Sequence, residues 1–276
     1  MITPFLSDFS FFGNPLLKLV QDLSYIRNFE TCLQRSCGQI IHLLHGDDWV
    51  EHGFYERMQQ LFEQHQEIGA AFCRQVYVDE QGLQKSLSPL EQQESGILEN
   101  WLEKVVSGIP IQTVSMTVKR EVYENLGGFD QRFTCCFEDR EMWVRIATHY
   151  PVGYEIEPLA VYRLMSNESL TKRKVRSGEY SRDLSKGHKI IESELQKDSS
   201  VKLTNHTFFK ARETSAFFML NLANQMLQAN DVEGVLIQVR EALICSQSFK
   251  VIKAISKILI KLGISQLKSI SVSIPI

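Results

Sequence analysis

The stretch IIHLLHGDDWVEHGFYERM, residues 40–58, decides the fold class of this chain. It begins with a short apolar run, which is typical of a buried strand in a mostly parallel sheet. Gly46 and two adjacent aspartates, Asp47 and Asp48, then break the strand. Neighbouring carboxylates repel each other, so the pair either turns the chain toward water or holds a cation. Gly53 opens a helix in which Phe54, Met58 and Leu61 share one face.

The rest of the chain alternates between strand and helix patterns as far as residue 170. Strand-like runs occupy 70–82, 111–120 and 152–164, and helix-like periodicity occupies 29–37, 96–108 and 137–150. Such alternation indicates an α/β layer fold. After residue 171 a polar, basic segment is followed by three amphipathic helical segments. We therefore expect a core over 1–170, a polar linker or helix over 171–200 and an all-α extension over 201–276.

Composition excludes several classes of function. The 276 residues are 43% hydrophobic and 23% charged, as in an ordinary globular protein. A formal net charge of −3 argues against a nucleic-acid partner, which usually meets a basic excess. No apolar run reaches about 18 residues, so no membrane-spanning helix is expected, and the apolar start lacks the basic residues of a signal peptide. The six cysteines form no C-x-x-C pair, which favours reduced thiols in a cytoplasmic protein.

A second acidic pair stands in GGFDQRFTCCFEDREMWVRI, residues 127–146. Glu138 and Asp139 follow a Gly-Gly turn and a loop, and they open a predicted helix. Carboxylates are stabilised at a helix N-terminus, so the pair is explained equally by capping and by a role for Asp139 as a general base. Trp143 lies one turn further along the same helix.

Three blocks together resemble the successive signature blocks of family 2 glycosyltransferases. They are IHLLHGDDWVEHGFYERM (41–58), IQTVSMTVKREVYENLGGFDQRFTCCFEDREMWVRIA (111–147) and YPVGYEIEPLAVYRLMSNESLT (150–171). Their order and spacing match over roughly residues 28–172. The resemblance implies a GT-A fold, in which a Rossmann-like, mostly parallel sheet flanked by helices binds a nucleotide-diphospho-sugar through a divalent cation, Mn²⁺ or Mg²⁺.

The resemblance also implies roles for particular residues. Asp47 and Asp48 match the metal-binding acidic motif, and Asp139 matches the aspartate that deprotonates the acceptor in one inverting displacement. Glu138 and Trp143 would shape the acceptor side, and Arg163 would lie near the phosphates. His45 occupies the place of a further acidic residue, as a neutral ligand, a phosphate contact or a structural residue.

Two departures from the family pattern affect these expectations. The strands that hold the nucleoside in the family have no counterpart before residue 28, so we expect an N-terminally shortened core. Met165 stands where many relatives place a histidine, and a thioether is a poor ligand for Mg²⁺ or Mn²⁺. The methionine predicts weak or donor-dependent metal binding.

The leading hypothesis is sugar transfer from a nucleotide-sugar donor to a glycan or lipid-linked acceptor, as in polysaccharide biosynthesis. The alternative is a catalytically degenerate relative that acts as an interaction module, and metal-dependent phosphoester hydrolysis is a third reading. Because the core is expected to be shortened, association as a homo-oligomer or with a partner subunit is a further alternative. The basic, amphipathic segment FKVIKAISKILIKLG (249–263) either packs on the core or contacts a membrane surface. The expected location is cytoplasmic, with peripheral contact at the inner membrane face as one option.

Overall fold

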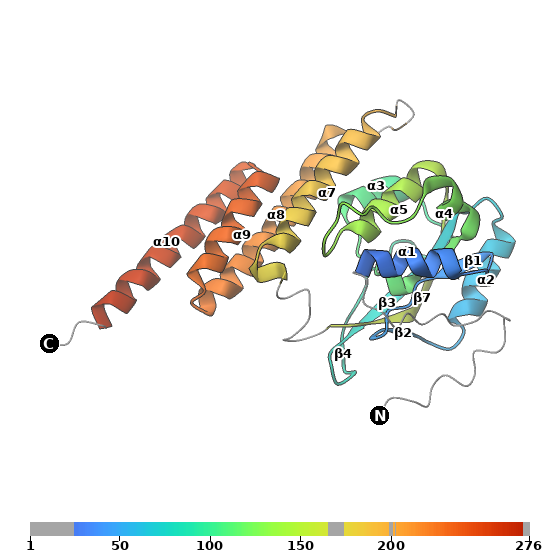
Figure 1. Cartoon of the computed structure of the whole chain (residues 1–276), viewed down its shortest axis with the longest axis horizontal. Helices are drawn as coiled ribbons and strands as arrows, with labels where there is room; N and C mark the ends of the chain where they lie inside the picture. The colour runs from blue at the N-terminus through green and yellow to red at the C-terminus, as the bar shows by residue number, and fades with distance from the viewer. Residues whose placement is uncertain (1–24, 165–173, 199–200, 202, 273–276) are drawn as a thin grey trace.

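One sheet of seven strands carries the first part of the chain, and a group of long helices extends from it (Figure 1). The computed structural model describes residues 25–164, 174–198, 201 and 203–272, with side chains described as far as residue 264. The strands are β1 (Ile40–His42), β2 (Trp49–Val50), β3 (Ala70–Val78), β4 (Gln84–Leu87), β5 (Gly96–Ile97), β6 (Met116–Lys119) and β7 (Val152–Arg163).

The central path of the sheet runs β1-β6-β3-β7-β2, with β4 beside β3 and β5 beside β7. The long strands β3 and β7 pair in parallel, from Ala70 opposite Val152 to Val78 opposite Arg163. The other pairs formed by the described strands are antiparallel. The α/β class is confirmed, but the expected mostly parallel sheet is wrong. A strand buried on both faces shows the same apolar run in either direction, because the connections, not the composition, set its direction.

Helices cover both faces of this sheet. They are α1 (Tyr25–Arg35), α2 (Phe54–Gln64), α3 (Trp101–Ser107), α4 (Arg120–Leu126) and α5 (Glu138–His149). Successive residues of β3 point to opposite faces. Phe72 belongs to the larger apolar cluster with residues of α3, α4 and α5, whereas Ala71 belongs to a smaller cluster with the predicted apolar face of α2. The sheet therefore separates two apolar layers.

The predicted all-α extension is confirmed. In the described residues it contains α8 (Asn205–Gln228), α9 (Val232–Cys245) and α10 (Phe249–Val272), and α7 (Glu179–Leu195) joins it from the segment 171–200 that was expected to be a polar linker or helix. Asp231 accepts a hydrogen bond from the Gly234 amide and Ser248 from the Val251 amide, so both side chains cap the helices that follow them. Within the residues that the structure describes, no helix combines the length and the apolar character needed to cross a bilayer.

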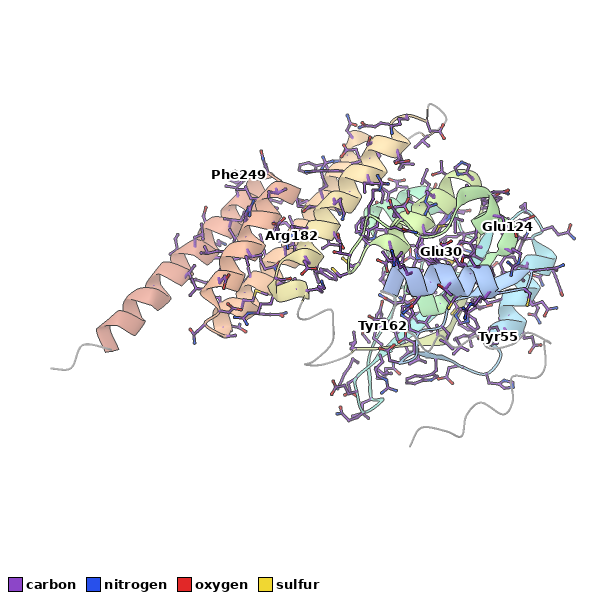
Figure 2. All side chains as sticks on the ribbon, in the orientation of Figure 1. Glu30, Tyr55, Glu124, Tyr162, Arg182 and Phe249 are labelled. Atoms are coloured by element: carbon purple, nitrogen blue, oxygen red, sulfur yellow. The ribbon has the colours of Figure 1, made fainter. Side chains whose placement is uncertain are left out.

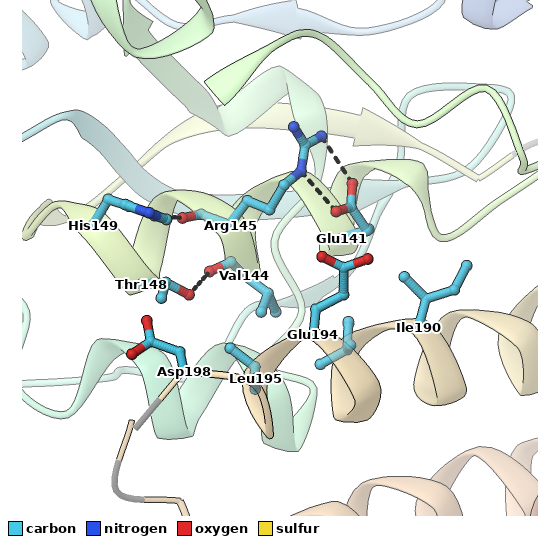
Figure 3. Close-up of a pocket in the computed structure, with 10 residues that line it drawn as sticks. Glu141, Val144, Arg145, Thr148, His149, Ile190, Glu194, Leu195 and Asp198 are labelled. Carbon is cyan, nitrogen blue, oxygen red and sulfur yellow. Dashed lines mark hydrogen bonds and ion pairs between the residues drawn. The ribbon is translucent and has the colours of Figure 1, made fainter. Parts of the chain in front are cut away.

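The helical extension packs directly on the helix that carries the second acidic pair. Figure 3 shows α5 and α7 on either side of a small cleft, with Arg145 paired to Glu141 along α5. Near the start of α5, Phe137 lies over Gly187 of α7, where an added Cβ would stand only 2.1 Å from the ring. A glycine at 187 therefore permits the close approach of α7 to the first turn of α5.

Candidate functional site

The acidic turn lies between β1 and β2, and the pairing of β2 with β7 brings it to the end of β7. The Arg163 amide, the last of β7, donates a 2.9 Å hydrogen bond to Asp48 Oδ1. The Arg163 guanidinium donates to the carbonyls of Asp47 (3.1 Å) and Glu80 (2.7 Å) and lies over the Trp49 ring. Arg163 therefore ties the acidic turn to β7 and to the β3–β4 hairpin.

Asp48 is buried without being fully paired. Asp48 is 9% exposed, and its Oδ2 atom has no hydrogen-bond partner within the described part of the chain. Burial raises the pKa of Asp48 to about 7, the Arg163 amide opposes that rise, and the charge of Asp47 adds to it. A cation beside Oδ2 would favour the ionised carboxylate.

His45 stands beside this carboxylate. Its Nδ1 is 3.8 Å from Asp48 Oδ2, and its ring stacks on Phe29 with a centroid distance of 5.3 Å. Nε2 is buried and meets no partner among the described residues. Burial lowers the pKa of His45, although the nearby charges of Asp47 and Asp139 act in the opposite direction. The imidazole is therefore neutral near pH 7 and can donate a lone pair to a metal ion.

These residues fit a divalent cation. One donor atom each from His45, Asp47 and Asp48 lies within 4.8 Å of the other two. The buried, unpaired Asp48 Oδ2 and His45 Nε2 are polar atoms that an ion or a phosphate could satisfy. Carboxylate oxygens with one imidazole suit Mn²⁺, and carboxylates with water suit Mg²⁺. The structure therefore contains a candidate metal-binding group at the predicted acidic turn.

The predicted general base, Asp139, lies in the first turn of α5. Its neighbour Phe137 precedes α5 with a left-handed φ of 77°, a conformation that is uncommon outside glycine. Asp139 Oδ1 accepts a 2.6 Å hydrogen bond from the Arg140 amide. Burial raises the pKa of Asp139, and Arg140 and His45 partly offset that rise. The charge of Asp139 in turn opposes the lowering of the His45 pKa.

Tyr162 is a site residue that sequence reasoning missed. It precedes Arg163 on β7, lies edge-on to Tyr77 and is labelled in Figure 2. Burial raises the pKa of Tyr162 to about 12, with further contributions from the charges of Asp48, Asp47 and Asp139. Its hydroxyl therefore stays protonated at neutral pH. The signal in the sequence was an aromatic residue beside Arg163 at a strand end.

The two remaining predicted residues lie deeper. Trp143 is 2% exposed and packs against Phe129 in the larger apolar cluster. Any effect of Trp143 on an acceptor is therefore indirect, through the packing of α5. Glu138 is also buried, in the first turn of α5. Met165 lies outside the described residues.

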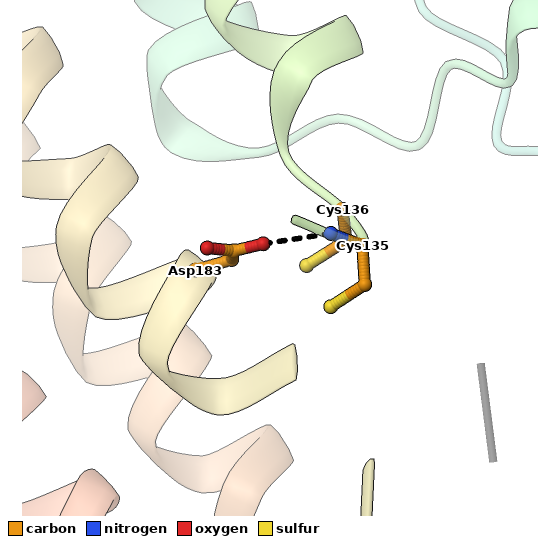
Figure 4. Close-up of side chains that lie close together, drawn as sticks. All are labelled: Cys135, Cys136 and Asp183. Atoms are coloured by element: carbon orange, nitrogen blue, oxygen red, sulfur yellow. Dashed lines mark hydrogen bonds between the residues drawn. The ribbon is translucent and has the colours of Figure 1, made fainter. Parts of the chain in front are cut away.

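A second group of metal-ligand residue types occurs just before α5. Cys135, Cys136 and Asp183 bring their side chains together where α7 meets the loop (Figure 4). Asp183 Oδ2 accepts hydrogen bonds from Thr134 and from the Cys135 amide, and Oδ1 pairs with Lys186 at 2.8 Å. Burial tends to raise the pKa of Asp183, but these partners lower it overall. The carboxylate is thus fully used in holding the loop on α7.

Comparisons with known proteins give distant matches. No family model matches the chain. Over 74 residues it is 34% identical to the O-antigen biosynthesis protein RfbC of Myxococcus xanthus. These 74 residues make up 27% of this chain and 5% of that protein. The chain therefore spans about a twentieth of the curated relative that it matches.

Two solved structures show a similar arrangement. A crystal structure of residues 1–349 of TarS from S. aureus has a TM-score of 0.48 and 9% identity, covering 80% of this chain and 71% of that one. The mannosyltransferase PcManGT from Pyrobaculum calidifontis, in complex with GDP-Man and Mn²⁺, has a TM-score of 0.47 and 14% identity, covering 92% and 69%. The chain is thus similar over a short stretch to an O-antigen biosynthesis protein and, at low sequence identity, to two solved structures, one of them a mannosyltransferase.

Proposed function

We propose that this chain transfers a sugar from a nucleotide-diphospho-sugar to a hydroxyl of a glycan or lipid-linked acceptor, with inversion at the anomeric carbon. The observation that supports the proposal is that the charges of two motifs about 90 residues apart act on the same neighbouring groups. The charge of Asp139 acts on His45 and on Tyr162, and the charges of Asp47 and Asp48 act on Tyr162 as well. This is the arrangement that a donor diphosphate and an acceptor hydroxyl need if they are to meet.

In the proposed reaction Asp139 is the general base. The acceptor oxygen attacks the anomeric carbon, the bond from that carbon to the diphosphate oxygen breaks, and the hydroxyl proton passes to an Asp139 oxygen. A carboxylate whose pKa is raised by burial is a stronger base than an exposed one. The buried start of α5 holds this carboxylate in place, which lowers the entropic barrier to transfer.

His45, Asp47 and Asp48 would hold a divalent cation, Mn²⁺ or Mg²⁺, on the donor side. When bound, the cation would supply charge stabilisation for the leaving diphosphate. Arg163 positions Asp48 through its amide, and its guanidinium would add a positive charge near the donor phosphates. Tyr162 can donate a hydrogen bond from its protonated hydroxyl to the donor or to the acceptor.

The proposal includes a cytoplasmic location. The six cysteines are free thiols, which favours a reducing compartment. A lipid-linked acceptor would also require contact with the membrane face on that side. Association with a second copy or with a partner subunit is a further option, and sedimentation of the purified protein tests it.

The decisive experiment is Asp139→Asn in a transfer assay with Mn²⁺, a panel of nucleotide-sugars and a glycan acceptor. We expect release of nucleoside diphosphate to fall about 10²–10⁴-fold, the usual contribution of a positioned base. The matched control is Glu124→Gln, the same carboxylate-to-amide change at an exposed position on α4.

Two further readouts test the mechanism. Activity of the wild type should decline as pH falls through the raised pKa of Asp139, because only the ionised carboxylate accepts a proton. Nuclear magnetic resonance of the product should show the anomeric configuration opposite to that of the donor. Full activity in Asp139→Asn, or a retained configuration, would contradict the assignment of Asp139.

A further inference from the structure

The last helix, α10, has three different faces. Val251, Ile255, Ile258 and Leu262, spaced three or four residues apart, are buried against α8 and α9. Every other long side chain of the described part of α10 points away from this contact. Because a packed terminal helix needs only one apolar face, the composition of the outward surface requires a separate explanation.

One outward face is apolar. Phe249, Ile252, Leu259, Ile260 and Ile264 recur at helical spacing and are exposed, Phe249 by 80% and Ile260 by 63%. Figure 2 labels Phe249 at the N-terminal end of this helix. Ser256 lies on the same face, and its hydroxyl donates to the Ile252 carbonyl, so its polar group is already paired. Exposed large apolar residues gathered on one face usually mark an interaction surface.

The other outward face is a row of lysines. Lys250, Lys253, Lys257 and Lys261, again three or four residues apart, are all exposed beside the apolar face. The sequence contains no Asp or Glu after Glu241. The region is therefore cationic in a chain whose formal net charge is −3. Such a concentration of positive charge selects a negatively charged partner.

These two faces together fit an anionic lipid surface better than a second copy. An isologous dimer through α10 would bring one row of lysines close to another, with no acidic residue in α10 to offset the repulsion. A helix in the membrane interface instead buries its apolar side chains below the headgroups, while the lysines beside them meet the headgroup charges.

The apolar surface also continues beyond α10. Phe209 of α8 and Phe249 line one hollow together with Lys210 and Lys250, so aromatic and basic groups recur side by side. Glu213 lines the same hollow and is the acidic residue there. We propose that α10, with this end of α8, binds the surface of a lipid bilayer that carries anionic headgroups. The binding is peripheral and does not require sugar transfer.

The test is co-sedimentation of the full chain with vesicles of equal parts phosphatidylglycerol and phosphatidylcholine, compared with vesicles of phosphatidylcholine alone. We expect binding to the anionic vesicles that weakens with added salt. Each lysine near such a surface contributes about fivefold to binding. The pair Lys257→Gln and Lys261→Gln should therefore reduce the partition coefficient by at least about tenfold.

Matched variants separate this surface from general charge and apolarity. The pair Lys189→Gln and Lys197→Gln removes the same charge from the exposed surface at and just after α7 and should bind as the wild type does. The pair Ile252→Ser and Ile260→Ser should lose binding, whereas Leu83→Ser with Leu90→Ser, on exposed leucines at and after the β3–β4 hairpin, should not. Asp139→Asn should bind vesicles normally, which keeps this test independent of catalysis.

Three outcomes would overturn the proposal. They are no binding to anionic vesicles at low salt, equal binding to both kinds of vesicle, and equal losses in the control pairs. If light scattering shows a dimer that the α10 variants dissociate, and no vesicle binding accompanies it, the surface is an interface between copies instead.

Discussion

Asp48 and Asp183 are both buried, and the difference between them separates the candidate site from the helical extension. Asp183 is 2% exposed, and both of its oxygens have protein partners. Asp48 accepts one amide hydrogen bond, and its second oxygen has no partner among the described residues. The pKa of Asp183 is lowered, and the pKa of Asp48 is raised to about 7.

The contrast separates a carboxylate whose two oxygens are paired by the protein from one that keeps an unpaired oxygen. A buried charge is stable when hydrogen bonds and an ion pair replace its water, as at Asp183. The protein partners of Asp48 do not replace all of its water, so burial makes its ionisation costly. Both residues belong to groups with metal-ligand chemistry, but only the group at Asp48 has unpaired oxygen and nitrogen atoms.

The largest expected effect in this comparison is on folding stability. Asp183→Ala should lower the free energy of unfolding by about 3 kcal/mol, because buried donors of the loop before α5 lose their acceptor. Asp48→Ala should change the stability of the metal-free protein by less than about 1 kcal/mol, because it removes a poorly paired charge. Urea unfolding followed by circular dichroism measures both. Equal losses would show that the two carboxylates are equally structural.

Metal addition should reverse the ranking of the two residues. At a Mn²⁺ concentration about a hundred times its dissociation constant, the wild type should gain about 2.7 kcal/mol of stability, which a thermal shift detects. Asp48→Asn, which keeps an acceptor for the Arg163 amide, should lose this response. Asp183→Asn should be less stable but should still respond. A response lost only in Asp183→Asn would place the ion at the cysteine group instead.

The pH dependence of stability should also differ between the two regions. His188 of α7 is buried, its Nε2 lies 2.7 Å from Ser215 Oγ, and burial with the charges of Arg140 and Arg212 lowers its pKa to about 3. A group whose pKa is lower in the folded state than in the unfolded state stabilises the fold at pH values above its unfolded pKa. This stabilisation is lost as pH falls below the unfolded pKa. The loss between pH 7 and about pH 5 is roughly 2 kcal/mol.

His188→Gln should flatten this part of the stability curve relative to the wild type. The raised pKa of Asp48 acts with the opposite sign in the metal-free protein, since its contribution is lost as pH rises through about 7. Thermal unfolding at a series of pH values, with and without Asp48→Asn, separates the two terms. Parallel curves for wild type and His188→Gln would show that His188 is not held neutral.

Local patterns in the sequence determined much of this molecule. The acidic turn after a strand, Gly53 at the start of α2 with a left-handed φ, the caps at Asp231 and Ser248 and the helical extension all follow from neighbouring residues. Local patterns succeed where the interacting groups are close along the chain.

Only the tertiary structure decided which groups share a site. The direction of β6, the burial of Trp143 and the effect of distant carboxylate charges on Tyr162 depend on residues that are far apart in the sequence. The sequence alone marked Asp48 and Asp139 as candidates and passed over Asp183. Whether a carboxylate is paired depends on donors from other elements, here Arg163 for one aspartate and Thr134 with Lys186 for another. Spacing along the chain carries no record of those donors, because folding brings them into place.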